Sequence, residues 1–230
     1  MPIVVAFISQ KGGVGKSTLA RALAAVAAHA RLKVMVADLD PRQHTLMHWE
    51  KARRENNIAP SLIVEAFDDV ETALAAAAKC DLLIVDAPGH VDQGTLEIAR
   101  VAHLIVQPTG AGLDDLRPAV LVFHELVRAG IPNTRLAAAM CRVLDADEEV
   151  AARAYLAEAG YEVLAGSIPE RSAYRAAQNS GRALTETAKT SLTKRPDALM
   201  EALLLKIAAL LDEAARRTKV KTGKSTEDAA

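Results

Sequence analysis

The chain has 230 residues, of which 50% are hydrophobic and 25% charged, so it is long enough to bury one sizeable core and has the size of a single α/β domain. Its formal net charge of −1 excludes a global electrostatic attraction to nucleic acid or to an anionic membrane, so any such binding must come from a local patch. The two cysteines, Cys80 and Cys141, exclude a framework of several disulfides and a zinc site with Cys-x-x-Cys spacing.

Short aliphatic runs alternate with longer segments rich in alanine and leucine. The runs are apolar without alternation, which predicts fully buried strands at 3–9, 33–37, 62–65, 82–86, 104–108 and 136–143. The segments between them predict helices, among them 17–30, 43–55, 70–79 and 114–129. This alternation predicts an α/β fold with a mostly parallel, twisted sheet and helices on both faces. Ligands bind such sheets at the carboxyl ends of the strands.

The last part of the chain departs from this alternation. It contains a short apolar run at 163–168, a helix that begins near Ser172, and a long amphipathic helix from about Pro196 to Arg217. After Arg217 the composition turns to Lys, Thr, Gly, Ser and Asp, which predicts a polar, disordered tail over 218–230. We therefore expect a single domain over 1–217, with no membrane-spanning segment and no signal peptide.

A glycine-rich turn follows the first predicted strand directly and opens a helix: Gln10-Lys11-Gly12-Gly13-Val14-Gly15-Lys16-Ser17-Thr18. Glycines let backbone N–H groups point inward, and the helix N-terminus adds partial positive charge, so the turn predicts a site for a phosphate chain. We expect Lys16 on the β- and γ-phosphates and Ser17 on Mg²⁺. The strict pattern G-x-x-x-x-G-K-S/T is not met, because position 10 is Gln; the chain carries K-G-G-x-G-K-S/T.

This variant pattern resembles the deviant Walker A box of the ParA/MinD family of P-loop ATPases. The resemblance implies that ATP or ADP is bound with Mg²⁺ by Lys11, Gly12, Gly13, Val14, Gly15, Lys16, Ser17 and Thr18. It also implies that Lys11 is the signature lysine, which reaches across a dimer interface to the phosphates bound by the other subunit. A cation supplied in trans favours the dimer only when the charge of a triphosphate meets it.

Acidic residues end the next strands. Asp38 and Asp40 follow the run 33–37, and two such acids repel each other unless a cation or a polarised water lies between them. The segment resembles the D-x-D-P-Q box of the family, with Arg42 where Gln is usual. The resemblance implies that Asp40 orients or activates the attacking water and that Asp38 supports the Mg²⁺ shell. Alternatively, both acids only cap the following helix.

The run 82–85 leads to Asp86-Ala87-Pro88-Gly89, which is the Walker B pattern and resembles the D-T-P-G element of the family. The resemblance implies that Asp86 reaches the metal through water and that Gly89 senses the γ-phosphate. Arg142 and Ile168-Pro169-Glu170-Arg171 resemble the positions that wrap the adenine base, and 112–118 resembles a loop that lies against the partner subunit. Alternatively, these are ordinary strand ends. The lone Trp49 predicts packing.

The chain begins at the first strand and so resembles the short partition ATPases, which lack an N-terminal helix-turn-helix module. This implies a cytoplasmic, nucleoid-associated ATPase that dimerises with ATP, binds DNA non-specifically and positions a plasmid, chromosome or other large cargo. Its slow hydrolysis would be stimulated by a ParB-like or other adaptor protein. The candidate DNA contacts are the basic residues of the last third: Arg171, Arg175, Arg182, Lys189, Lys194 and Arg195.

Three alternatives stay open. The basic residues can form a solvated face without a partner. The chain can be a MinD-like membrane-cycling regulator, although its polar tail without an aromatic anchor argues against stable membrane binding. It can also be a metabolic enzyme of the same superfamily, such as an amidoligase or a biotin-pathway synthetase, which would need a pocket for an acceptor substrate.

Overall fold

The computed structural model describes residues 1–40, 44–89, 93–187 and 189–227. Within them, one parallel sheet has the order β3-β2-β4-β1-β5-β6-β7, with β8 paired to β6. The strands are β1 (Ile3–Phe7), β2 (Val34–Asp38), β3 (Ile63–Ala66), β4 (Leu82–Asp86), β5 (Leu104–Thr109), β6 (Leu136–Val143), β7 (Glu162–Val163) and β8 (Ile168–Pro169). The predicted parallel sheet is confirmed.

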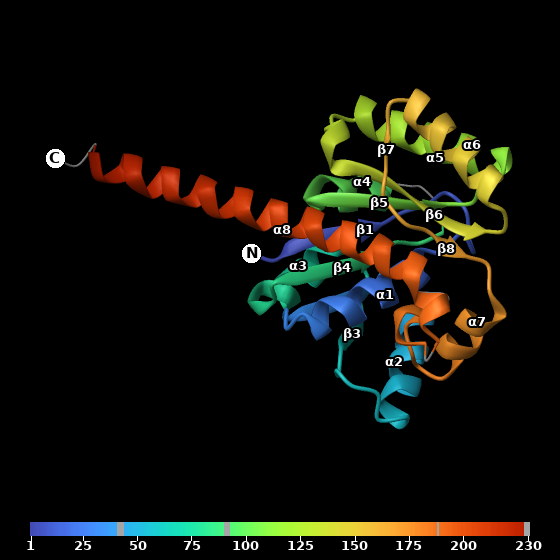
Figure 1. Ribbon diagram of the computed structural model, residues 1–230. Helices are drawn as coiled ribbons and strands as arrows, with labels where there is room; N and C mark the ends of the chain where they lie inside the picture. The colour runs from blue at the N-terminus through green and yellow to red at the C-terminus, as the bar shows by residue number, and fades with distance from the viewer. Residues whose placement is uncertain (41–43, 90–92, 188, 228–230) are drawn as a thin grey trace.

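Helices cover both faces of the sheet (Figure 1). They are α1 (Lys16–His29), α2 (Thr45–Glu55), α3 (Val70–Ala76), α4 (Gln93–Val101), α5 (Leu113–Arg128), α6 (Ala146–Glu158), α7 (Ser172–Asn179) and α8 (Thr190–Glu227). Helices α1, α2, α7 and α8 pack on one face and α3 to α6 on the other, so each face has its own apolar cluster. Strands β1, β2, β4 and β5 are therefore buried along their whole length.

Trp49 packs where α2 meets the segment after α7. Its indole Nε1 donates to the carbonyl of Arg182 at 3.2 Å, and the guanidinium groups of Arg21 and Arg53 lie 5.6 and 5.5 Å from its ring centroid. Arg53 is only 2% exposed and donates to both carboxylate oxygens of Glu186, at 2.6 and 2.8 Å. The bonds of Trp49 and Arg53 thus fix α2 against the segment that follows α7.

Helix α8 runs from Thr190 to Glu227, so it begins earlier and ends later than the predicted helix from about Pro196 to Arg217. Pro196 lies inside it. Pro196 has no N–H for the carbonyl of Leu192, and that carbonyl accepts a hydrogen bond from the hydroxyl of Tyr174 instead. The helix also covers most of the segment that we expected to be a disordered tail, and residues 228–230 lie outside the described residues. Its C-terminal part extends beyond the body of the molecule in Figure 1. No helix in the described residues has the length and apolarity needed to span a membrane.

Candidate functional site

The carboxyl ends of β1, β2 and β4 meet at one edge of the sheet. In the strand register Phe7 is paired with Asp86, and Asp38 is also paired with Asp86, so the acids that end β2 and β4 lie side by side next to the loop that leaves β1. A cavity of about 240 Å³ opens there. It is lined by Gly12, Gly13, Gly15, Lys16, Ser17, Thr18, Arg21, Asp38, Asp40, Thr45, Asp86, Ala87, Gly89 and Gln178.

The glycine-rich loop has the shape of an anion cradle. Gly13 and Gly15 have φ angles of 74° and 119°, a region that L side chains rarely adopt. Gly15 directly precedes α1, whose N-terminus has neither a side-chain cap nor an acidic residue in its first turn, as far as the described residues show. The first N–H groups of α1 thus remain for an anionic ligand.

Lys16 points into this cradle. Its side chain is 8% exposed, and its pKa lies below the usual value because burial penalises the charged form, while Asp86 and Asp40 oppose that shift. Gly89, after β4, faces the same space, since a Cβ at that position would lie 3.8 Å from Lys16 Nζ and 3.7 Å from the Cα of Gly12. The structure therefore places Gly89 against the loop.

The acids and Ser17 fit a divalent cation. Asp86 is 3% exposed, and its Oδ1 has no hydrogen-bond partner among the described residues. Burial, with Asp38 nearby, raises the pKa of Asp86 to about 7, against the opposing hydrogen bond of Ser17 and the charges of Lys16 and Arg21. A buried carboxylate oxygen without a partner, next to a hydroxyl and a phosphate cradle, is the donor set that Mg²⁺ takes beside a bound phosphate chain.

Asp38 performs the helix-capping role that we left open for it. Its Oδ1 accepts the N–H of Asp40 and its Oδ2 accepts the N–H of Leu46, both at 3.1 Å. The same carboxylate lines the cavity beside Asp86, so capping α2 and supporting a metal shell are compatible roles. Asp40 also lines the cavity. Arg42, which stands where Gln is usual in the family box, lies outside the described residues.

Lys11 does not point into the cavity of its own subunit. Its Nζ lies 2.8 Å from Oδ1 of Asp115, in the first turn of α5, and the two side chains are 41% and 28% exposed. Sequence reasoning did not single out Asp115, although it lies in the segment 112–118 that we assigned to the partner-facing loop. The resemblance implies that Lys11 contacts the phosphates bound by a second subunit, whereas here it is paired with an acid of its own chain.

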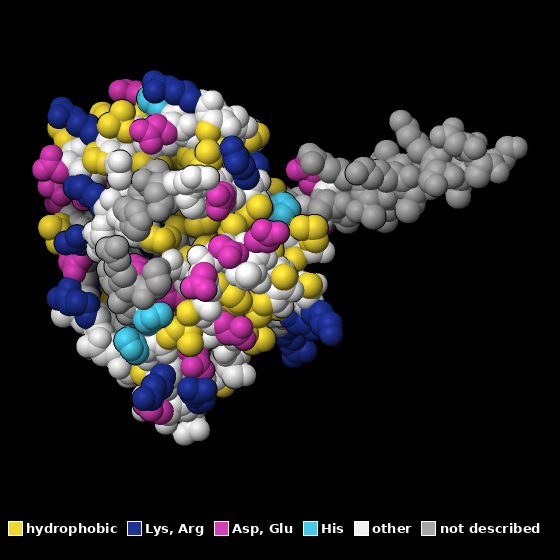
Figure 2. Space-filling view, turned by 180° about the vertical axis from the view of Figure 1, so that it is seen from behind, with side chains coloured by type: hydrophobic (Ala, Val, Ile, Leu, Met, Phe, Trp, Pro, Cys, Tyr) yellow, Lys and Arg dark blue, Asp and Glu magenta, His cyan; other side chains and the backbone are white. Residues whose placement is uncertain are grey.

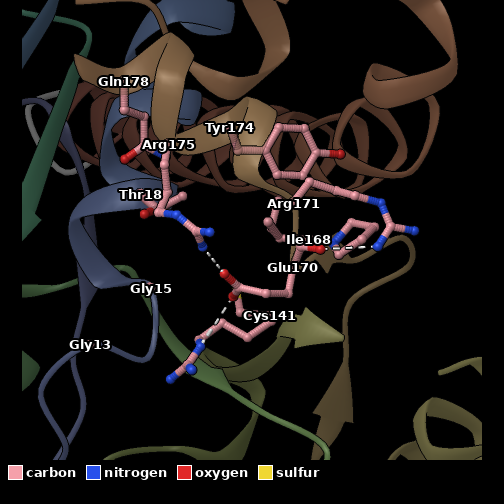
Figure 3. Close-up of a pocket in the computed structure, with 12 residues that line it drawn as sticks. Gly13, Gly15, Thr18, Cys141, Ile168, Glu170, Arg171, Tyr174, Arg175 and Gln178 are labelled. Atoms are coloured by element: carbon pink, nitrogen blue, oxygen red, sulfur yellow. Dashed lines mark hydrogen bonds and ion pairs between the residues drawn. The ribbon is translucent and has the colours of Figure 1, made fainter. Parts of the chain in front are cut away.

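A second cavity, of about 260 Å³, shares Gly13, Gly15, Thr18 and Gln178 with the first (Figure 3). It is also lined by Cys141, Arg142, Ile168, Pro169, Glu170, Arg171, Tyr174 and Arg175. The structure therefore brings Arg142, Ile168 and Pro169, which the resemblance assigns to the adenine base, to one cavity next to the loop, and the base site stays a prediction.

Glu170 belongs to the segment that the resemblance places around the base, whereas Cys141, Tyr174 and Gln178 line the same cavity and were not predicted as site residues. The carboxylate of Glu170 lies between two guanidinium groups, with Arg142 Nε at 3.3 Å on one side and Arg175 on the other (Figure 3). The backbone carbonyl of Glu170 accepts a hydrogen bond from Arg171 at 3.0 Å. The cavity wall is therefore charged as well as apolar.

The six basic candidates for DNA contact do not form one set. Arg171 and Arg175 line the second cavity. Arg195 is paired with Glu149 and donates to Ser167 Oγ at 3.0 and 2.7 Å, so it joins α8 to the segment before β8. Arg182, Lys189 and Lys194 are exposed at the surface.

The loop geometry, the buried lysine and the paired acids define a P-loop nucleotide-binding protein. The chain belongs to the family described as the CobQ/CobB/MinD/ParA nucleotide-binding domain, whose profile matches residues 5–184. This confirms the predicted family and, with it, the expected ATPase class.

Curated relatives support the assignment. The chain is 27% identical over 186 residues to the maintenance of carboxysome distribution protein A of Gloeobacter kilaueensis, covering 80% of this chain and 85% of that protein. It is also 27% identical over 221 residues to the chromosome-partitioning ATPase Soj of Thermus thermophilus, covering 81% of this chain and 89% of that protein.

Solved structures confirm the fold. The septum site-determining protein MinD of Pyrococcus horikoshii, in complex with Mg-ADP, matches with a TM-score of 0.71 and 17% identity, covering 88% of this chain and 96% of that one. A putative plasmid partition protein of Borrelia burgdorferi, bound to AMPPNP, matches with a TM-score of 0.70 and 18% identity, covering 90% of this chain and all of that one. The nucleotides in these two structures agree with the cofactors predicted for this chain.

Proposed function

We propose that this protein is a positioning ATPase: it binds ATP with Mg²⁺, dimerises through the face that carries Lys11, and moves a large cargo over the nucleoid in the cytoplasm. The observation that carries the proposal is the cavity that joins the glycine cradle, Lys16, the unpartnered Asp86 oxygen and Asp40. The curated names of the two relatives, one for carboxysome distribution and one for chromosome partitioning, support a positioning role.

The loop and the charged residues of the cavity take different roles in the proposed reaction. The loop N–H groups and Lys16 hold the phosphates, while Ser17 and Asp86 would hold the metal ion, with Asp38 beside them. Bound Mg²⁺ would neutralise charge that develops on the phosphates. Asp40, on the wall of the same cavity, orients the water that attacks the terminal phosphate.

The dimer is supported by the position of Lys11. Its partner Asp115 is partly exposed, and exposed ion pairs contribute only about 0–1 kcal/mol. A triphosphate in a facing subunit offers several negative charges, so exchanging Asp115 for that ligand is favourable. A hydrolysis-stimulating adaptor protein of the ParB-like kind completes the proposed cycle.

DNA is the proposed matrix, but fewer basic residues support this proposal than the sequence suggested. Of the six basic candidates, Arg182, Lys189 and Lys194 are exposed and not part of the second cavity or the Glu149 cluster. The face shown in Figure 2 carries Lys and Arg mostly near its rim, with Asp and Glu among many of them. The region from α7 to the start of α8 is therefore the proposed contact surface.

The test is a titration of labelled duplex DNA at several salt concentrations with ATP, with ADP, and with the variant Arg182→Ala/Lys189→Ala. We expect the ATP form to bind DNA of any sequence, and the variant to bind more weakly with a flatter salt dependence, each lost phosphate contact reducing the log–log slope by roughly 0.9. Arg100→Ala/Arg128→Ala, which removes the same charge from α4 and α5, should bind like the wild type. If the ATP form ignores DNA and floats with anionic liposomes, the MinD-like alternative replaces this proposal.

A further inference from the structure

A buried arginine shares the wall of the phosphate cavity with the acids. Arg21 lies on α1, one helical turn after Ser17, and is 8% exposed. The α1 residues around it, Leu19, Ala20, Ala22 and Leu23, are fully buried and apolar. Arginine is almost never buried unless it is paired, so its presence here calls for a specific role.

The guanidinium of Arg21 connects three helices. Nη1 donates to Oε1 of Gln178 on α7 at 2.6 Å, and Nη2 donates to the carbonyl of Thr45, the first residue of α2, at 2.9 Å. The Nε atom is buried and has no hydrogen-bond partner in the part of the chain that the structure describes. The side chain thus holds α2 and α7 at fixed positions relative to the phosphate loop, and one donor remains unused.

Arg21 also faces the acids that fit the metal. Burial lowers the pKa of Arg21 to about 10, and the charges of Asp86 and Asp38 raise it against that effect, so the group is cationic at neutral pH. A fixed positive charge near two carboxylates reduces the potential that attracts a divalent cation, and this effect is large where water is excluded. Arg21 and a bound metal ion therefore compete for the same negative charge.

We propose that Arg21 is a positioning residue that makes metal binding depend on the nucleotide. Its charge keeps Asp38 and Asp86 from binding a divalent cation alone, and its hydrogen bonds to α2 and α7 hold the cavity in the shape that receives the nucleotide. Phosphates entering the cradle add the negative charge that a metal ion then requires. The inference rests on the proposed function, because it concerns the same metal and phosphate site.

The direct test measures binding of Mn²⁺ alone by electron paramagnetic resonance, without nucleotide. We expect the wild type to bind Mn²⁺ weakly and Arg21→Gln to bind it at least about tenfold more tightly, because one opposing charge is lost. Arg21→Lys, which keeps the charge, should behave like the wild type. Equal Mn²⁺ affinity of Arg21→Gln and wild type, or an Arg21→Lys variant that binds as tightly as Arg21→Gln, would overturn the proposal.

A second measurement follows a fluorescent ATP analogue during a Mg²⁺ titration. Arg21→Gln should bind the analogue more weakly in EDTA, because a cation near the phosphates is lost, and should reach half-maximal Mg²⁺ enhancement at a lower Mg²⁺ concentration. A purely structural role would weaken nucleotide and metal binding together. If Arg21→Gln folds poorly, Arg21→Met provides a neutral variant that suits the apolar surroundings, with the same expected results and the same overturning outcomes.

The matched control is Arg135→Gln. Arg135 also has a buried Nε without a described partner and a pKa lowered by burial, but it precedes β6, at the opposite end of the strands, and donates to the carbonyls of Ala99 and Ala102. Its loss should change stability and leave Mn²⁺ binding unchanged; a change in Mn²⁺ binding as large as that of Arg21→Gln would overturn the proposal. Failure of the wild type to bind ATP with Mg²⁺ would refute the proposed function, whereas the comparison of Mn²⁺ affinities tests Arg21 by itself.

Discussion

Replacing Asp86 by Asn should stabilise the nucleotide-free protein while it removes metal-dependent nucleotide binding. Burial raises the pKa of Asp86 from 3.8 to about 7, so the folded state resists ionisation of this carboxyl and the unfolded state does not. The resulting cost to folding begins near pH 4, grows with rising pH, and is complete above the folded-state pKa. Asn keeps the shape of the side chain and carries no charge, so it avoids the cost.

The magnitude follows from the two pKa values. They differ by about three pH units, and each unit corresponds to about 1.4 kcal/mol, so the gain for Asp86→Asn at pH 8 has an upper bound of about 4 kcal/mol. The gain should be close to zero at pH 4, increase up to pH 7, and remain constant above it. Adding ATP with Mg²⁺ should stabilise the wild type more than the variant, because the variant keeps the loop and Lys16 but has lost the carboxylate that holds the metal.

The assay is urea unfolding of both proteins in EDTA at a series of pH values from 4.5 to 8.5, at about half-unit steps. Asp69→Asn is the control: this exposed carboxyl caps α3, and the N–H of Thr72 lowers its pKa from 3.8, so the pH-dependent part of its effect falls below this range and its stability difference from the wild type should stay constant across it. An Asp86→Asn variant whose stability difference from the wild type does not grow between pH 5 and pH 7 would refute the reasoning.

Three further predictions concern the dimer, the reaction and the fold. Lys11→Ala should abolish ATP-dependent dimerisation, measured by light scattering, while some ATP binding remains through Lys16; normal dimerisation would make Lys11 an ordinary loop residue. Asp40→Ala should keep nucleotide binding, trap the ATP-bound dimer and reduce turnover at least about 100-fold, whereas unchanged turnover would place the role elsewhere. Glu186→Gln should lower the free energy of unfolding by about 3 kcal/mol, because it removes the paired charge from buried Arg53, and a loss below about 1 kcal/mol would contradict this.

The sequence predicts the central sheet well because its strands carry an unambiguous signal. Strands β1, β2, β4 and β5 are covered on both faces, so they read as continuous apolar runs. The run 163–168 is different, since it divides into β7 and β8 around Gly166. Gly166 has a φ of 74°, and a Cβ there would lie 2.3 Å from the backbone N of Leu199 in α8. That break is set by a distant helix, and local pattern does not show it.

Two helices were not singled out from the sequence. Helix α6 has its own start signal, because the Asp145 side chain accepts the N–H groups of Asp147 and Glu148. Its apolar residues are sparse, however, so the helical period is weak. Helix α4 is short and follows positions 90–92, which lie outside the described residues.

Some residues of the site are contiguous in the sequence, and others come together only in the fold. The phosphate loop is contiguous in sequence, so its glycines and Lys16 could be predicted from a single motif. Asp115 and Gln178, by contrast, contact Lys11 and Arg21 across 104 and 157 residues. No spacing rule connects such residues, because the strand order β4-β1-β5 and the packing of α7 on α1 and α2 bring them together.

Pro196 in α8 connects that helix to the second cavity. An unbroken helix would have no spare carbonyl at Leu192, but Pro196 frees it, and the hydroxyl of Tyr174 binds there. The ring of Tyr174 forms part of the second cavity wall (Figure 3), and its hydroxyl bonds the first turn of α8, so one side chain connects the two. A ligand that displaces Tyr174 would pull on the start of a 38-residue helix. Leu199, Leu203 and Ile207 hold α8 in the core on this face of the sheet, so the packing of the helix resists such a displacement.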